Sequence, residues 1–262
     1  MDLGIAGKRA LVLGGNRGIG FGVARALANE GVHVAIAARD AARLGEAARE
    51  LKASADVEVH TASIDLSRVD MLPAFAEELT ARFGTIDILV NNTGGPEYGG
   101  ASGRALKEWS DRFQDMVLSV IALTDSLLPG MRAKRWGRIL TVISSGVIQP
   151  IPILGISNTL RASLVGWSKT LSSEVAANGI TANVLVPGRI DTERVRTTDE
   201  AVAAKQGLSV EEVQKRSTST IPLGRYGTIE EFGATAAFVA SEKASYMTGA
   251  MIRVDGGIVR SW

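Results

Sequence analysis

The chain has no cysteine, almost no net charge and no long apolar run, and each absence removes a class of function. Without cysteine there are no disulfides, thiolate metal sites or cysteine nucleophiles. The formal net charge of +1 gives no general attraction to nucleic acid or to an anionic membrane. No stretch approaches the ~18 apolar residues that cross a bilayer, and the first residues lack the pattern of a signal peptide. We therefore expect a cytoplasmic protein with neither nucleic acid nor membrane as a partner.

Short apolar runs alternate with longer helical patterns over the 262 residues. Such alternation predicts a three-layer α/β Rossmann fold, with a seven-stranded parallel sheet and helices on both faces. No Pro-, Gly- or Ser-rich linker divides the chain, so we expect residues 1–262 to form one domain. The predicted strands are Arg9 to Leu13, Val32 to Ala37, Val57 to Ile64, Ile86 to Val90, Arg138 to Ile143, Thr181 to Val186 and Ala250 to Val254. The predicted helices are Gly20 to Glu30, Ala41 to Ala53, Met71 to Phe83, a long helix within Leu106 to Met131, Ser157 to Asn178, and one that begins near Thr228.

A polar segment, Asp191 to Thr220, separates the sixth predicted strand from the last predicted helix. It is rich in Thr, Glu, Arg and Ser. Long loops in compact domains usually serve as lids or binding loops. A solvated helical insertion is an equally good interpretation, so the pattern leaves both open.

A glycine-rich turn, Gly14 to Gly20, lies between the first predicted strand and the first predicted helix. A phosphate must come close to backbone N–H groups, and glycine leaves room for that approach. The helix N-terminus adds a partial positive charge. The spacing of Gly14, Gly18 and Gly20 differs from the G-x-G-x-x-G fingerprint. The setting of strand, turn and helix nevertheless favours a site for nucleotide phosphates.

The end of the second predicted strand, Ala38-Arg39-Asp40, indicates which nucleotide is bound. A site selective for NAD usually has an acid here for the ribose 2′-hydroxyl, whereas an Arg accommodates a 2′-phosphate. Ala38 is neutral, Arg39 follows it, and Arg17 lies in the glycine turn. Two guanidinium groups that converge on one dianion form a strong site. The alternative is two exposed arginines, one of them paired with Asp40, but together with the glycine turn the pattern favours NADP(H).

Polar residues also follow the third and fourth predicted strands. Asp65 can accept a hydrogen bond from an adenine amino group, or it can cap a helix. The run Asn91-Asn92-Thr93-Gly94 follows the fourth strand, where a glycine lets a cofactor lie against the backbone. Asn and Gly also form plain turns, so this second interpretation stays open.

Together these segments resemble the short-chain dehydrogenase/reductase family over nearly the whole chain, and within it the 3-oxoacyl-acyl-carrier-protein reductases. The glycine turn matches the family motif, except that Leu13 replaces its Thr. Pro187-Gly188 and the C-terminal stretch Val254 to Gly257 match further motifs. The resemblance implies that NADP(H) is bound by Gly14, Asn16, Arg17, Gly18, Ile19, Gly20, Arg39, Asp65, Leu66, Asn91, Asn92, Thr93, Gly94, Arg161, Pro187, Gly188, Ile190 and Thr192.

The catalytic positions depart from the family pattern of Ser, Tyr and Lys, with an Asn on the preceding helix. In that pattern the Tyr gives a proton to the carbonyl oxygen as hydride arrives. Alignment places Ser157 at the Tyr, Arg161 at the Lys and Met116 at the Asn. The family Ser corresponds to Ser145 or to its neighbour Ser144. A serine hydroxyl is a far weaker acid than a phenol, whose pKa is ~10, but an arginine can still bind ribose or stabilise an oxyanion.

Few other side chains offer a replacement for these groups. Tyr98 follows the loop after the fourth strand and either reaches a substrate carbonyl or is a partly exposed loop residue. His33 and His60 fall inside predicted strands and are interpreted as structural. No cluster of His, Asp or Glu has the spacing of metal ligands, so we expect no metal.

The leading hypothesis is an NADP(H)-dependent oxidoreductase of this family that acts on a small carbonyl or alcohol, with an acyl-type substrate among the options. The alternative is a non-catalytic NADP(H)-binding protein, such as a sensor or a partner subunit, since the Tyr, Lys and Asn are replaced. The resemblance also implies a homo-oligomer, with a tetramer expected. Its interface would use the helix Ser157 to Asn178 and the C-terminal strand.

Overall fold

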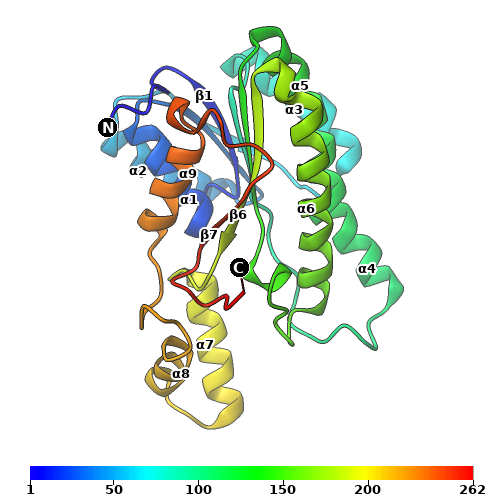
Figure 1. Ribbon diagram of the computed structural model, residues 1–262, viewed down its shortest axis with the longest axis vertical. Helices are drawn as coiled ribbons and strands as arrows, with labels where there is room; N and C mark the ends of the chain where they lie inside the picture. Colours follow the sequence, from blue (N-terminus) through cyan, green and yellow to red (C-terminus); the bar gives the residue numbers. More distant parts are fainter. Residues whose placement is uncertain (262) are drawn as a thin grey trace.

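The computed structural model describes residues 1–261 and has a seven-stranded sheet at its centre (Figure 1). The strand order is β3-β2-β1-β4-β5-β6-β7, and all neighbouring strands run parallel. This arrangement confirms the predicted Rossmann fold. The strands are β1 (Arg9–Leu13), β2 (His33–Ala38), β3 (Val59–Ser63), β4 (Ile88–Asn91), β5 (Gly137–Val142), β6 (Ile180–Pro187) and β7 (Met251–Val254).

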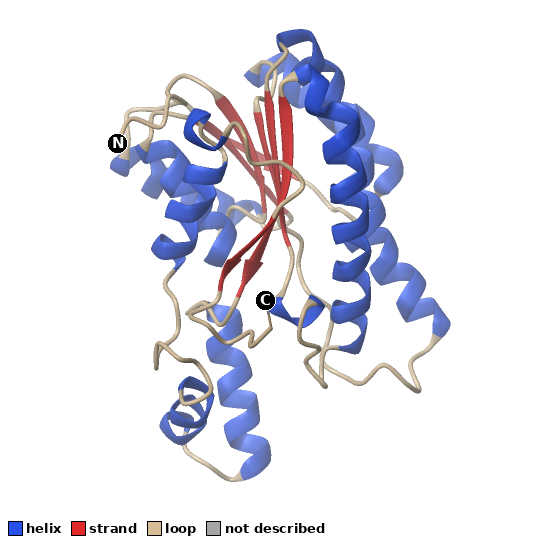
Figure 2. Cartoon of the chain, in the orientation of Figure 1, coloured by secondary structure: helices blue, strands red, loops and turns tan. Residues whose placement is uncertain are grey.

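Helices cover both faces of this sheet (Figure 2). One face is covered by α1, α2 and α9, and the opposite face by α3, α5 and α6. Right-handed crossovers between parallel strands produce this distribution. The helices are α1 (Gly18–Asn29), α2 (Ala41–Ser54), α3 (Leu72–Phe83), α4 (Leu106–Phe113), α5 (Ser119–Lys134), α6 (Gly155–Val175), α7 (Glu193–Gln206), α8 (Val210–Thr218) and α9 (Ile229–Val239).

The two hydrophobic cores explain why the central strands carry apolar residues at successive positions. Successive residues of a strand point to opposite faces, and both faces of this sheet are buried. In β1, Ala10 and Val12 pack into the core shared with α1, α2 and α9. Leu11 and Leu13 pack into the core shared with α3, α5 and α6.

The polar segment that follows β6 folds into two helices, α7 and α8, and not into an irregular loop. Helices α7 and α8 form a pair that projects from the sheet on the side of the strands' carboxyl ends, at the bottom of Figure 1. Thr192 caps α7, and a reciprocal capping box between Ser209 and Glu212 starts α8. The insertion therefore lies on the side of the sheet where ligands bind in open α/β folds.

Some predicted boundaries need correction. The third strand is shorter than the predicted Val57 to Ile64, because only the residues from Val59 to Ser63 pair with β2. The helix predicted within Leu106 to Met131 continues to Lys134 and contains a π-turn, Gln114–Leu118, between α4 and α5. By length and composition alone the run Leu106–Lys134 could cross a membrane, but half of its most apolar window is buried in the fold, as in a core helix.

Candidate functional site

The glycine turn after β1 forms a tight cradle at the start of α1. Gly14 and Gly18 have φ values of +60° and +55°, which side-chain-bearing residues rarely adopt. A Cβ on Gly20 would lie 2.2 Å from the carbonyl oxygen of Gly14, so the turn and the helix are in direct backbone contact. No side chain caps the N-terminus of α1, and its first N–H groups remain available to a phosphate. The cradle thus fits a pyrophosphate group, with Asn16 and Ile19 within the same turn.

Three arginines lie near the end of β2, and two of them share one carboxylate. The guanidinium of Arg17 donates to the Glu193 carboxylate at 2.8 Å, and that of Arg43 donates to the same carboxylate at 2.9 Å. Arg39 makes no side-chain hydrogen bond or ion pair within residues 1–261, and the convergence of Arg17 and Arg39 on a cofactor phosphate stays a prediction. The alternative pairing of an arginine with Asp40 involves Arg43, one helical turn later.

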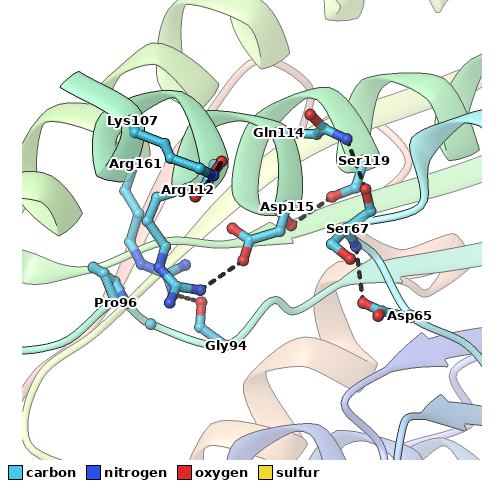
Figure 3. A network of polar contacts seen from close by, with 12 residues as sticks. Asp65, Ser67, Gly94, Pro96, Lys107, Arg112, Gln114, Asp115, Ser119 and Arg161 are labelled. Carbon is cyan, nitrogen blue, oxygen red and sulfur yellow. Dashed lines mark hydrogen bonds and ion pairs between the residues drawn. The ribbon is translucent and has the colours of Figure 1, made fainter. Parts of the chain in front are cut away.

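Asp65 lies after β3 in a turn that is fastened to the helix carrying the π-turn (Figure 3). Its carboxylate accepts a hydrogen bond from the backbone N–H of Ser67 at 3.0 Å, and this bond lowers the pKa of Asp65. The amide nitrogen of Gln114 donates to the carbonyl oxygen of Ser67 at 2.7 Å. Asp65 is thus an exposed, ionised acceptor, and the neighbouring Leu66 packs its side chain against the core.

The segment Asn91 to Gly94 forms the floor of the site at the end of β4. Asn92 donates from its side chain to the carbonyl oxygen of Leu13 at 3.1 Å and so fastens this floor to the glycine turn. Asn91 donates to the hydroxyls of two buried threonines behind the floor. The Oδ1 atom of Asn91 and the Oγ1 atom of Thr93 are buried and have no hydrogen-bond partner among the described residues. Unsatisfied buried polar atoms are uncommon, and they fit a site that receives a polar ligand.

The Pro187 to Thr192 segment closes the opposite side of the site. Gly188 packs so tightly against Asp255 that a Cβ there would lie 2.6 Å from its Cα atom. Ile190 is buried, and Thr192 caps the first turn of α7. The methyl group of Thr192 would lie 3.4 Å from a Cβ on Gly18, so this segment faces the glycine cradle across a narrow gap.

The serines of the expected catalytic centre lie beyond the end of β5 and on α6. Ser144 caps a short 3-10 turn, and its hydroxyl accepts a hydrogen bond from the backbone N–H of Gly146 at 3.1 Å. The hydroxyls of Ser145 and Ser157 make no hydrogen bond within the described part of the chain. Ser157 is only 5% exposed, in the first turn of α6. Of the two neighbouring serines, Ser145 therefore has the freer hydroxyl.

Arg161 lies one turn after Ser157 on the same helix and is 7% exposed. Its guanidinium donates to the carbonyl oxygens of Val142 at 2.9 Å, Thr93 at 3.1 Å and Gly94 at 3.3 Å. Burial, together with the positive charge of Arg194, lowers the pKa of Arg161 to about 10, so the group stays charged at neutral pH. Arg161 therefore brings a buried positive charge to the carboxyl ends of β4 and β5, and Figure 3 shows it beside Gly94.

The alignment predicts that Met116 takes the position of the family's helix Asn. Met116 is buried in a hydrophobic cluster with residues of β6 and α6, where it offers no donor. The residue before it, Asp115, pairs with Arg112 at 2.8 Å, yet its Oδ1 atom is buried without a partner among residues 1–261. Burial raises the pKa of Asp115, although Arg112 opposes the shift.

Three residues of the site were missed by the sequence reasoning. Arg43 and Glu193 are described above, and Arg194 donates to the carbonyl oxygens of Gly95 at 3.2 Å and of Pro96 at 3.1 Å. Arg43 had a readable signal, since it lies four residues after Arg39 at the start of a predicted helix. The two residues of α7 had none, because their partners are far away in the sequence.

Tyr98 is 43% exposed and contacts α7. Its hydroxyl hydrogen-bonds with the Thr198 hydroxyl, and the Arg194 guanidinium lies 5.8 Å from the centre of its ring. The structure therefore places Tyr98 at the contact between the loop after β4 and α7. The Tyr226 hydroxyl contacts the same helix and donates to the carboxylate of the buried Asp199 at 2.9 Å.

Comparison with known proteins gives consistent matches over the whole chain. A family model described as enoyl-(acyl carrier protein) reductase matches residues 14–259. The 3-oxoacyl-[acyl-carrier-protein] reductase FabG of Chlamydia muridarum is 33% identical over 254 residues, which cover 97% of this chain and 98% of that protein. The crystal structure of L-sorbose reductase from Gluconobacter frateurii with NADPH and L-sorbose has a TM-score of 0.96 at 33% identity and covers 100% of both chains. An actinorhodin polyketide ketoreductase variant with NADPH has a TM-score of 0.91 at 30% identity, covering 97% of this chain and 98% of that one.

Proposed function

The chain belongs to the short-chain dehydrogenase/reductase family and is an NADP(H)-dependent oxidoreductase, and we propose that it transfers hydride between NADP(H) and a small carbonyl or alcohol. The sequence predictions of family and cofactor are thereby confirmed, and the relatives do not favour the non-catalytic alternative. One observation carries the proposal. Arg161 places a buried positive charge beside the glycine-containing floor, Ser157 precedes it by one turn of α6, and Ser145 follows the end of β5.

The chain's own residues account for cofactor binding. The glycine cradle and the uncapped N-terminus of α1 would hold the pyrophosphate. Arg17 and Arg39 would take the 2′-phosphate, and Asp65 would accept from the adenine amino group. The floor from Asn91 to Gly94 and the segment from Pro187 to Thr192 would enclose the nicotinamide end. When bound, the cofactor supplies or accepts a hydride there.

The serine and arginine side chains would act on the substrate oxygen. In the reducing direction the carbonyl carbon gains the hydride and the oxygen gains a proton. The hydroxyls of Ser145 and Ser157 are free to donate hydrogen bonds to that oxygen, and Arg161 stabilises the negative charge that develops on it. A serine cannot replace a phenol as the acid, so we propose that the proton comes from water through these hydroxyls. Met116 offers no relay that would resupply it.

The test is NADPH oxidation with a panel of carbonyl compounds, run beside an NADPH-binding titration. The panel should include a keto sugar and a 3-oxoacyl thioester, since the relatives include a sorbose reductase and 3-oxoacyl reductases. We expect turnover that falls about 100-fold or more in Ser157→Ala, with unchanged NADPH affinity. Ser163→Ala, exposed on the same helix, is the matched control. Tight NADPH binding without turnover of any compound would contradict hydride transfer and favour the non-catalytic alternative.

We also propose that the protein is a cytoplasmic homotetramer. The sheet ends in β7, whose outer edge pairs with no other strand among residues 1–261. Met251 on this edge and the nearby Tyr246 are exposed apolar side chains. On α6, a Cβ added at Gly166 would meet no atom within 4 Å, so this part of the helix presents open surface. Flat, exposed elements of this kind suit the closed symmetry of soluble homo-oligomers.

A further inference from the structure

The Glu193 carboxylate lies where we expect a phosphate of the cofactor to bind. It is the first residue of α7, and its carboxylate accepts from Arg17 at 2.8 Å and from Arg43 at 2.9 and 3.4 Å. The two arginines hold the pKa of Glu193 at about 2, so the carboxylate is charged at any physiological pH. An internal anion thus bridges the glycine turn and the first turn of α2.

The position of this ion-pair bridge relative to the expected cofactor is more informative than the strength of the ion pairs. Arg17 lies in the turn between β1 and α1, and Arg43 lies just beyond the end of β2. In a Rossmann fold the adenosine ribose lies at the end of the second strand, and its 2′-substituent faces the residues that follow. The two guanidinium groups that meet on Glu193 are therefore placed to meet on a 2′-phosphate.

The same first turns of α7 also contact the loop that follows β4. Arg194 holds the backbone at Gly95 and Pro96, and Thr198 holds Tyr98. A Cβ on Gly95 would lie 2.6 Å from the Arg194 guanidinium, so this side chain packs directly against the backbone next to the floor of the site. A ligand that displaced Glu193 would therefore remove two of the contacts that hold the start of α7 in place.

We propose that Glu193 is an internal competitor of the cofactor's 2′-phosphate, and that its displacement from Arg17 and Arg43 frees the start of α7. The side chains of all three residues are about half exposed, and ion pairs of that kind are weak. A phosphate carries up to two negative charges and pairs more strongly with arginine than one carboxylate does. NADP(H) therefore opens the bridge, whereas NAD(H), which lacks the phosphate, leaves it closed. The inference rests on the proposed function, which places the adenosine at the end of β2.

The proposed competition couples the Glu193 carboxylate to ligand affinity, which can be measured. If a carboxylate must be displaced, its removal raises the affinity for every ligand with a 2′-phosphate and for no other ligand. We expect Glu193→Gln to bind 2′,5′-ADP about 5-fold or more tightly than wild type, the lower end of typical coupling factors. Its affinity for 5′-ADP should stay unchanged. Glu200→Gln, which removes a charge from an exposed position of the same helix, is the matched control and should change neither affinity.

Arg43 supplies the second arm of the test. Arg43→Ala should weaken 2′,5′-ADP binding and leave 5′-ADP binding unchanged. Arg49→Ala, an exposed arginine of the same helix, should leave both affinities unchanged. Equal affinities of the Arg43 variant and wild type for 2′,5′-ADP would overturn the assignment of Arg43.

Hydrogen exchange of the peptide that covers the start of α7 reports the helix directly. In wild type, 2′,5′-ADP should speed exchange there, and 5′-ADP should not. In Glu193→Gln, exchange should already be fast and insensitive to both ligands. If 2′,5′-ADP slows exchange in wild type and Glu193→Gln binds it no better, the competition is refuted. If wild type binds NADPH no better than NADH, the cofactor placement of the proposed function fails instead.

Discussion

Replacing Arg161 with methionine tests what a buried guanidinium does at the centre of this site. The group has no acidic partner among the residues the structure describes, and it donates to the carbonyl oxygens of Val142, Thr93 and Gly94. These carbonyls end β5 and follow β4, so the side chain ties two neighbouring strand ends together. Methionine has a similar length and fills the same space without a donor.

The expected loss of folding stability in Arg161→Met is the net result of two opposing effects. A hydrogen bond to a charged group contributes about 1.5–3 kcal/mol, so the three together contribute about 4.5–9 kcal/mol. Burying an unpaired guanidinium costs several kcal/mol, which the methionine variant no longer bears. We expect a net destabilisation of about 2–4 kcal/mol, which lowers the Tm by about 4–16 °C for a chain of this size.

Calorimetric melting of the wild type and of Arg161→Met measures this effect, with Arg216→Met as control. Arg216 is exposed on α8 and makes no side-chain ion pair within residues 1–261, so its variant should melt like wild type. NADPH binding should weaken little, because the phosphate contacts are elsewhere, and carbonyl turnover should fall. A methionine variant that melts within about 2 °C of wild type would refute the role of these hydrogen bonds.

Three further predictions concern the catalytic centre, its pH dependence and assembly. Ser157→Tyr combined with Arg161→Lys should raise carbonyl reduction by tens to hundreds of fold at constant NADPH affinity, because a phenol beside a cation again offers a proton; initial rates with no gain would show that position 157 does not face the carbonyl. Burial raises the pKa of Asp115, so the native state binds more protons than the unfolded state between the ordinary and the raised pKa, and stability falls as pH rises through that window. Asp115→Asn should therefore be more stable than wild type at neutral pH and lose this advantage in acid, as followed by urea unfolding; an advantage that grows in acid would contradict the sign. Light scattering at micromolar concentration should give the mass of a tetramer, and a monomer would argue against the proposed assembly.

The sheet could be predicted because burial on both faces leaves a strong pattern. The central strands lie among apolar side chains above and below, so they stand out as apolar runs between polar helices. β1 matches its predicted bounds. β3 lies at the edge of the sheet and is shorter than predicted, and exposed polar residues alternate with more buried ones along it. The helical nature of the segment after β6 was also readable, since Ser209 and Glu212 have the spacing of a capping box.

The backbone part of the site was predictable, and the side-chain partners were not. Glycine is required where the chain must turn with positive φ or meet other backbone, so Gly14 and Gly18 mark the cradle from sequence alone. The partner of Arg17 lies 176 residues away, on a helix whose position depends on the whole fold. Nothing local in the sequence of Glu193 indicates that it meets two arginines.

The chain has Arg161 where the family pattern has a Lys, and the two side chains differ in their number of N–H donors. A lysine ammonium is compact and has three N–H groups, whereas a guanidinium has five in a rigid plane. Three of the five N–H groups of Arg161 hold carbonyl oxygens, which leaves two. One side chain can therefore brace the floor of the cleft and still offer N–H donors to a ribose hydroxyl or a substrate oxygen. With Ser157 one turn earlier and unbonded within residues 1–261, we expect the centre to keep its positioning groups and its charge, and to lack the phenol and the helix Asn of the family pattern. We expect hydride transfer at such a centre to depend on electrostatic stabilisation of the developing oxyanion more than on general acid catalysis.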